Sequence, residues 1–120
     1  MAKILVIEDN RQNMYLCTFI LNSHHHDVIQ AFSGREGIAI AGKIVPDLII
    51  LDIQLPEMDG YAVARELKNN PLTIRIPIVA VTSYAMTGDR ERSLAAGCAG
   101  YIEKPINPGT FMEEIAMHLP

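Results

Sequence analysis

The chain of 120 residues lacks the features of several protein classes. No stretch approaches the roughly 20 apolar residues that cross a membrane, and the first apolar run is too short and too close to acids for a signal peptide. There is no run of lysines and arginines, and the formal net charge of −4 argues against a nucleic-acid-binding face. The two cysteines have neither metal-binding nor CxxC spacing, so we expect free core thiols in a reducing cytoplasm.

Short apolar runs are present instead, with helical patterns between them. The runs cover residues 4–7, 28–32, 48–53, 76–81 and 100–102. Three of them are apolar at nearly every position, which is typical of strands buried on both faces of a sheet. The repeated alternation of strand and helix predicts an α/β fold, with helices on both faces of one parallel sheet. At this length we expect a single domain over residues 1–120 without an output domain.

The helices are predicted from apolar spacing and from capping residues. An apolar stripe that includes Cys17 indicates the first helix, and a capping box at 33–36 opens the second. Residues 62–68 and 90–96 fit a third and a fourth helix. The Asn-Pro pair at 107–108 fits the N-cap and first residue of a fifth.

Polar residues that can do chemistry come at the ends of these strands. Glu8 and Asp9 follow the first run, Asp52 ends the third, Thr82 follows the fourth and Lys104 follows the fifth. The carboxyl ends of parallel strands lie at one edge of a sheet, so we expect these side chains to gather there. Alone, each acid could simply cap a helix. It is their occurrence with a hydroxyl and an ammonium at matching strand ends that indicates a functional site.

A cluster of three carboxylates predicts a metal site. Two unit charges about 4 Å apart repel by about 1 kcal/mol in water and by roughly 4 kcal/mol at an effective dielectric near 20. A hard divalent cation removes that cost, and oxygen ligands suit Mg²⁺, with Mn²⁺ able to take the same donors. Thr82 and Lys104 can donate hydrogen bonds to an anion, so the whole set suits a phosphoryl group bridged to the metal. A carboxylate nucleophile would then form an aspartyl-phosphate.

Four strings of the sequence resemble the receiver domain of two-component response regulators. They are ILVIEDN, DLIILDIQLPEMDG, IPIVAVTSYAMTGDRE and AGCAGYIEKPI, in this order and over essentially the whole chain. The sequence is most similar to stand-alone, DivK-like receivers and to the receivers fused to hybrid histidine kinases. Its start at Met1 and its closure after a fifth helix favour the stand-alone form over an excised receiver. The resemblance implies a doubly wound, flavodoxin-like (βα)5 sheet with strand order 2-1-3-4-5.

The resemblance also implies the phosphoacceptor and the metal ligands. Asp52 would accept the phosphoryl group. Glu8, Asp9, Asp52 and the main-chain carbonyl of Gln54 would bind the metal. Glu8 stands where many members of the family have Asp, and its extra methylene would alter the geometry of the metal site without removing it.

Four further residues receive roles from the same resemblance. Thr82 would supply the hydroxyl that turns toward the phosphoryl oxygen, and Lys104 the ammonium that pairs with it. Tyr101 would be the aromatic switch residue that swings inward when Thr82 moves. The bond between Lys104 and Pro105 would be cis, which only about 5–6% of X-Pro bonds in folded proteins are.

These roles imply a signalling protein. A histidine kinase or phosphotransfer protein would supply the phosphoryl group, and the face made by the fourth helix, fifth strand and fifth helix would bind a downstream protein. We expect a monomer, or a dimer on phosphorylation, without direct contact with nucleic acid or membrane. The chain would be a phosphoacceptor rather than an enzyme, catalysing only its own phosphorylation and slow dephosphorylation.

Two other classes share parts of this pattern. A flavin- or nucleotide-binding domain of similar topology needs a glycine- or hydroxyl-rich loop after its first strand, where this chain begins with Glu8 and Asp9. A phosphatase with an aspartyl nucleophile commonly carries a second acid two residues later, where this chain has Gln54.

Three smaller features complete the expectations. The adjacent histidines 24–26 predict a surface loop rather than a metal site, because neighbours in a short loop do not easily converge on one ion. Ser83 could donate a hydrogen bond, but strand alternation predicts that its side chain faces away from Thr82. The stretch 84–88 is either part of a recognition surface or an ordinary loop.

Overall fold

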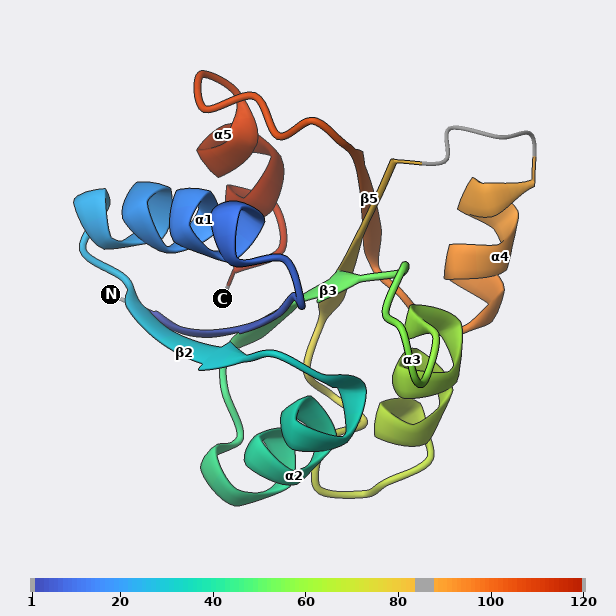
Figure 1. Cartoon of the computed structure of the whole chain (residues 1–120). Coiled ribbons are helices and arrows are strands. Elements are labelled where there is room, and N and C mark those ends of the chain that lie inside the picture. Colours follow the sequence, from blue (N-terminus) through green and yellow to red (C-terminus); the bar gives the residue numbers. More distant parts are fainter. Residues whose placement is uncertain (1, 84–87, 120) are drawn as a thin grey trace.

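Strands and helices alternate strictly along the chain (Figure 1). The computed structural model describes residues 2–83 and 88–119. The elements are β1 (Lys3–Ile7), α1 (Arg11–Ser23), β2 (Asp27–Ala31), α2 (Gly34–Ile44), β3 (Leu48–Asp52), α3 (Gly60–Lys68), β4 (Ile78–Thr82), α4 (Asp89–Ala95), β5 (Gly100–Glu103) and α5 (Phe111–Ala116). This is the predicted βα alternation.

The strands form one sheet of five parallel strands in the order β2-β1-β3-β4-β5. The predicted fold class and strand order are therefore confirmed. β1 and β3 lie side by side, with Ile7 opposite Leu51, and β4 follows with Val81 opposite Asp52. The residues that end these three neighbouring strands consequently meet at one edge of the sheet.

Hydrophobic side chains cover both faces of the sheet. In β1, Ile4 and Val6 pack in the core under α1 and α5, whereas Leu5 and Ile7 pack in the core under α2 and α3. Figure 1 shows α1 and α5 on one side of the sheet and α2, α3 and α4 on the other. Every residue of β3 and β4 is buried, as their unbroken apolar runs predict. The strands that carry the site are thus held from both sides.

Side-chain caps set the starts of three helices next to the site edge. Asn10, Ser33 and Asp59 cap α1, α2 and α3, each accepting a hydrogen bond from a main-chain N–H three residues later. Of the capping box predicted at 33–36, the Ser33 half is present, and Glu36 accepts a hydrogen bond from the Phe32 N–H at 2.6 Å, one residue before the N-cap. These caps satisfy donors that a helix start leaves unpaired.

The fifth helix begins later than predicted. α5 starts at Phe111, not at the Asn-Pro pair, and residues 108–110 form a turn. Asn107 still acts as a local cap, because its side chain accepts from the Gly109 N–H at 2.8 Å and its carbonyl from the Thr110 and Phe111 N–H groups. The predicted N-cap at Asn107 and first helical residue at Pro108 are therefore wrong: the turn that Asn107 caps precedes regular α-helix, whose N-cap is Thr110.

Other expectations concern parts of the chain away from the site. Cys17 and Cys98 are free and buried, as predicted, and burial raises the pKa of both thiols. The predicted histidine loop follows α1, where the Ala2 N–H donates to Nδ1 of His26 at 3.1 Å. Across residues 2–83 and 88–119, we find no helix with the length and apolar character that a membrane span requires.

Candidate functional site

The five residues singled out in the sequence lie at the same end of the sheet. Glu8 and Asp9 directly follow β1, Asp52 and Thr82 are the last residues of β3 and β4, and Lys104 directly follows β5. Glu8, Asp9 and Asp52 each offer a carboxylate oxygen within 4.8 Å of the others. In the part of the chain that the structure describes, no other group of three His, Cys, Asp or Glu residues is this compact. The predicted acidic cluster therefore exists, and the histidines take no part in it.

The acids differ sharply in exposure. Glu8 and Asp52 are each only 3% exposed, whereas Asp9 is exposed. Thr82 is fully buried beside them. Burying carboxylates is costly unless they are paired and hydrogen-bonded. The surrounding contacts must therefore compensate for this burial.

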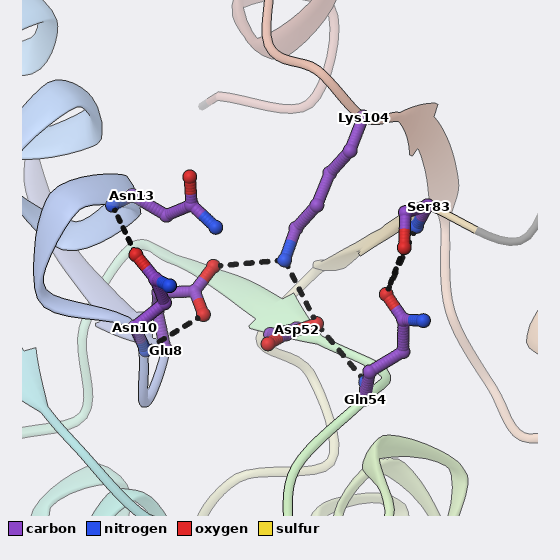
Figure 2. A network of polar contacts seen from close by, with 7 residues as sticks. All are labelled: Glu8, Asn10, Asn13, Asp52, Gln54, Ser83 and Lys104. Carbon is purple, nitrogen blue, oxygen red and sulfur yellow. Dashed lines mark hydrogen bonds and ion pairs between the residues drawn. The ribbon is translucent and has the colours of Figure 1, made fainter.

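Lys104 supplies that compensation. Its Nζ lies 3.2 Å from Glu8 Oε1 and 3.3 Å from Asp52 Oδ1, and Figure 2 shows the ammonium reaching both carboxylates from above. Burial by itself would lower the pKa of Lys104, but the charges of Asp52 and Glu8 and its hydrogen bonds to them outweigh it, so the pKa is raised. Lys104 thus stays an ammonium between the two acids.

Glu8 responds differently to the same surroundings. Burial raises the pKa of Glu8 from its usual 4.5 to about 7, and the hydrogen bond and charge of Asp52 act in the same direction. The Asn10 N–H and the charge of Lys104 oppose this rise without cancelling it. Near pH 7, Glu8 therefore either keeps its proton or needs a bound cation in addition to Lys104.

Main-chain donors hold both buried carboxylates. The Asn10 N–H donates to Glu8 Oε2 at 3.2 Å, and the Gln54 N–H donates to Asp52 Oδ1 at 3.0 Å (Figure 2). Both donors lie two residues beyond the acid that they contact, in the loops that leave β1 and β3. The loop geometry thereby fixes where the carboxylate oxygens point.

The donor set suits Mg²⁺. Three carboxylates with oxygens this close provide the hard oxygen ligands that Mg²⁺ and Mn²⁺ prefer, without the sulfur and imidazole groups typical of zinc or copper sites. Burial is the main cause of the raised pKa of Glu8, and a cation at its carboxylate would favour the ionised form. The residues present therefore fit the metal that the sequence predicts.

One contact at the site was not foreseen in the sequence. The side-chain oxygen of Gln54 accepts hydrogen bonds from the Ser83 N–H at 3.0 Å and from Ser83 Oγ at 2.6 Å. Ser83 therefore does serve as a hydroxyl donor, and it lies in a bend after β4, which ends at Thr82, so strand alternation no longer determines where its side chain points. No sequence pattern signals a pair separated by 29 residues.

Tyr101 belongs to β5, and Pro105 belongs to the segment that follows it. Tyr101 is half-buried on β5, opposite Ala80 of β4. The peptide bond between Lys104 and Pro105 is cis. Of the stretch 84–88, residues 84–87 lie outside the described residues.

Comparisons with known proteins agree with this geometry. The family described as response regulator receiver domain matches residues 4–116. The polar-differentiation response regulator DivK of Brucella ovis is 40% identical over 116 residues, which are 97% of this chain and 94% of that protein. The chemotaxis protein CheY4 of Vibrio cholerae has a similar structure, with a TM-score of 0.94 and 28% identity over 99% of both chains.

A further solved structure bears on the metal. The receiver domain of a sensor histidine kinase from Pseudomonas aeruginosa PAO1 has a TM-score of 0.85 and 32% identity, covers 96% of this chain and 98% of its own, and holds a magnesium ion in its active-site cleft. Neither a flavin- or nucleotide-binding domain nor an aspartyl phosphatase is supported by these likenesses. With its fold, its acidic cluster and its similarity over nearly the full length, the chain belongs to the response regulator receiver domain family.

Proposed function

We propose that Asp52 accepts a phosphoryl group from a phosphohistidine on a histidine kinase or phosphotransfer protein. An oxygen of Asp52 attacks phosphorus, a new O–P bond forms, the P–N bond breaks, and the imidazole leaves with the electron pair and takes up a proton. The observation that carries the proposal is the position of Lys104, whose ammonium contacts the buried carboxylates of both Glu8 and Asp52. A phosphoryl group added to Asp52 would find this cation in place.

Glu8, Asp9, Asp52 and the main-chain carbonyl of Gln54 are the residues that would hold Mg²⁺. The metal would neutralise charge on the phosphoryl oxygens. The three acids provide clustered oxygens for it, and the Gln54 carbonyl belongs to the loop whose N–H already fixes Asp52. Mn²⁺ takes the same oxygen donors and is expected to replace it.

Thr82 and Tyr101 are proposed to transmit the change. The phosphoryl group brings roughly −1.5 to −2 charge and new acceptor oxygens next to Asp52. Thr82, buried at the end of the adjacent strand, would turn its hydroxyl toward them, and Tyr101 on β5 would move into the space that Thr82 leaves. Strand β4 thereby couples the site to β5.

The proposed output is a protein contact on the face of α4, β5 and α5. This face has a hollow of about 300 Å³ whose lining includes Arg90, Tyr101 and Glu114. Because Tyr101 lines it, a movement of that ring would change its shape. We propose that residues 1–120 act as one receiver domain, a signalling phosphoacceptor that turns over no external substrate and binds a downstream protein as a monomer or as a dimer.

Acetyl phosphate provides the direct test. Incubation with Mg²⁺ should add the mass of one phosphoryl group to the protein, and neither Asp52→Asn nor a sample treated with EDTA should take it up. Intact-mass spectrometry measures both. A phosphoryl adduct on folded Asp52→Asn would show that another residue is the acceptor and would refute the proposal.

Thr82→Ala separates phosphorylation from its transmission. The variant should still form the adduct, because Asp52 and its metal ligands remain, but the amides of β5 should no longer respond to it. Hydrogen exchange of β5 before and after phosphorylation measures the response, and Thr82→Ser, which keeps the hydroxyl, is the matched control. An unchanged response in Thr82→Ala would contradict the coupling scheme.

A further inference from the structure

The Gln54 side chain links two loops at the mouth of the site. Figure 2 shows its amide turned away from Asp52 and toward Ser83. One oxygen, Gln54 Oε1, accepts both the Ser83 N–H at 3.0 Å and the Ser83 hydroxyl at 2.6 Å. Two donors from a single residue therefore converge on one neutral acceptor.

Both partners lie immediately beside the proposed phosphorylation site. Gln54 is two residues beyond Asp52, and its own main-chain N–H donates to Asp52 Oδ1. Ser83 directly follows Thr82 at the end of β4, and β3 and β4 are in register there, with the Ile53 N–H donating to the Val81 carbonyl at 3.0 Å. Ser83 thus lies next to the end of β3 that carries Asp52.

The chemistry of these donors suits an anion better than an amide. Hydrogen bonds to ionised oxygens are roughly twice as strong as those between neutral groups. A phosphoryl group on Asp52 carries about −1.5 to −2 charge and adds three acceptor oxygens. An N–H and an O–H that already converge on a single oxygen need little rearrangement to bind one of these oxygens instead.

We propose that the Gln54 amide oxygen holds the place of a phosphoryl oxygen in the unphosphorylated protein, and that phosphorylation of Asp52 displaces it from Ser83. This inference rests on the proposed function of Asp52. Gln54 and Ser83 act as positioning residues: their contact ties the loop after β4 to the loop after β3 in the resting state. When Ser83 changes its acceptor, Gln54 is released. Ser83, at the start of the β4–α4 loop, is then hydrogen-bonded to the phosphoryl group.

Beryllium fluoride with Mg²⁺, a stable stand-in for the phosphoryl group, measures the competition between the two acceptors. Gln54→Met keeps the side-chain length but removes the acceptor, so the resting contact no longer competes and binding should tighten by about 2- to 10-fold, the range of one neutral hydrogen bond. Gln54→Glu should weaken binding, because its carboxylate holds the Ser83 donors more strongly and repels the anion. Gln30→Met is the matched control, since the Gln30 side chain on β2 also bonds a hydroxyl, donating from Nε2 to Thr18 Oγ1, but contacts none of the proposed site residues.

The amide resonance of Ser83 distinguishes displacement from a purely structural role. In the free protein, Gln54→Met should shift this ¹⁵N–¹H resonance, because its acceptor is lost. With beryllium fluoride bound, wild type and Gln54→Met should give the same Ser83 resonance, because both then donate to the ligand. A structural role of Gln54 would shift the resonance in both states alike.

The outcomes separate this inference from the proposed function. If wild type neither forms the acetyl phosphate adduct nor binds beryllium fluoride with Mg²⁺, the proposed function fails and this inference fails with it. If wild type does both, but Gln54→Met and Gln54→Glu bind like Gln30→Met and wild type, the inference alone is overturned. A Ser83 resonance that differs equally in the free and bound states overturns it as well.

Discussion

At the scale of single residues, Glu8 shows how burial changes the pKa of an acid whose position at the strand end the sequence predicts. Its position after β1 follows from the apolar run before it, but its chemistry follows from being 3% exposed beside Asp52. Burial raises the pKa of Glu8 to about 7, although Lys104 lies 3.2 Å away. Ionising Glu8 near neutral pH therefore costs free energy, and the proposed metal ion would lower that cost.

Stability without metal should fall with rising pH on account of Glu8. The folded protein holds the Glu8 proton more tightly than the unfolded chain, so its contribution is fully present below about pH 4.5 and is lost as the pH rises through about 7. Glu8→Gln does not titrate. The free energy of unfolding of Glu8→Gln relative to wild type should therefore increase over this range, by on the order of 3 kcal/mol.

Urea unfolding at several pH values in EDTA measures this difference. Adding Mg²⁺ should restore stability to wild type above pH 7, where the Glu8 carboxylate is ionised, and much less to Glu8→Gln, which lacks a ligand. Parallel stability curves for the two proteins would show that Glu8 titrates in the folded state as it does in the unfolded chain.

At the scale of elements, the start of α3 presses directly on the strand that carries Asp52. A Cβ added to Gly60 would lie 2.5 Å from Ile53 Cα and 2.7 Å from the Asp52 carbonyl oxygen. These are main-chain atoms that cannot turn aside. The Gly60 N–H also donates to the Ile53 carbonyl at 2.9 Å, so the contact fixes the loop between β3 and α3.

Gly60→Ala should accordingly destabilise the protein, by about 1–3 kcal/mol or more, because α3 or the end of β3 must shift. The shift should also slow phosphorylation of Asp52 by acetyl phosphate. Gly42→Ala is the matched control: Gly42 lies in α2 with no atom within 4 Å of an added Cβ, so it should gain up to about 1 kcal/mol from helix propensity. Urea unfolding compares the variants, and equal stability of Gly60→Ala and wild type would disprove the close approach.

At the scale of the whole molecule, two hydrophobic cores share one sheet. One core joins the sheet to α2 and α3, the other joins it to α1 and α5, and adjacent residues of β1 and β3 belong to opposite cores. If the helices on one face of the sheet detached, they would expose strands whose other face still forms the second core. We therefore expect the two cores to unfold together.

Leu67→Ala in α3 and Leu21→Ala in α1 test this coupling from either side. Both side chains are almost fully buried, so each variant should lose about 2–5 kcal/mol of stability. In each, the transitions followed by far-UV circular dichroism and by tyrosine fluorescence should coincide. Met117→Ala, at a position that is 77% exposed, should stay within about 0.5 kcal/mol of wild type. Separate transitions in either leucine variant would show that the cores unfold independently.

Local patterns in the sequence predict most of the fold and the place of the site. Unbroken apolar runs predicted the buried strands, their alternation with helices predicted the parallel sheet, and Asp52 at a strand end marked the site. The start of α5 was missed because a cap at Asn107 is the same signal whether a turn or a helix follows.

The contacts between residues far apart in the chain become visible in the folded protein alone. That Lys104 lies between Glu8 and Asp52, that burial raises the pKa of Glu8, and that Gln54 binds Ser83 all depend on how the loops after β1, β3, β4 and β5 meet beyond the sheet edge. Apolar periodicity reports which face of an element is buried, and it says nothing about polar side chains that extend past the ends of strands. Distances and burial there follow from the packed sheet as a whole.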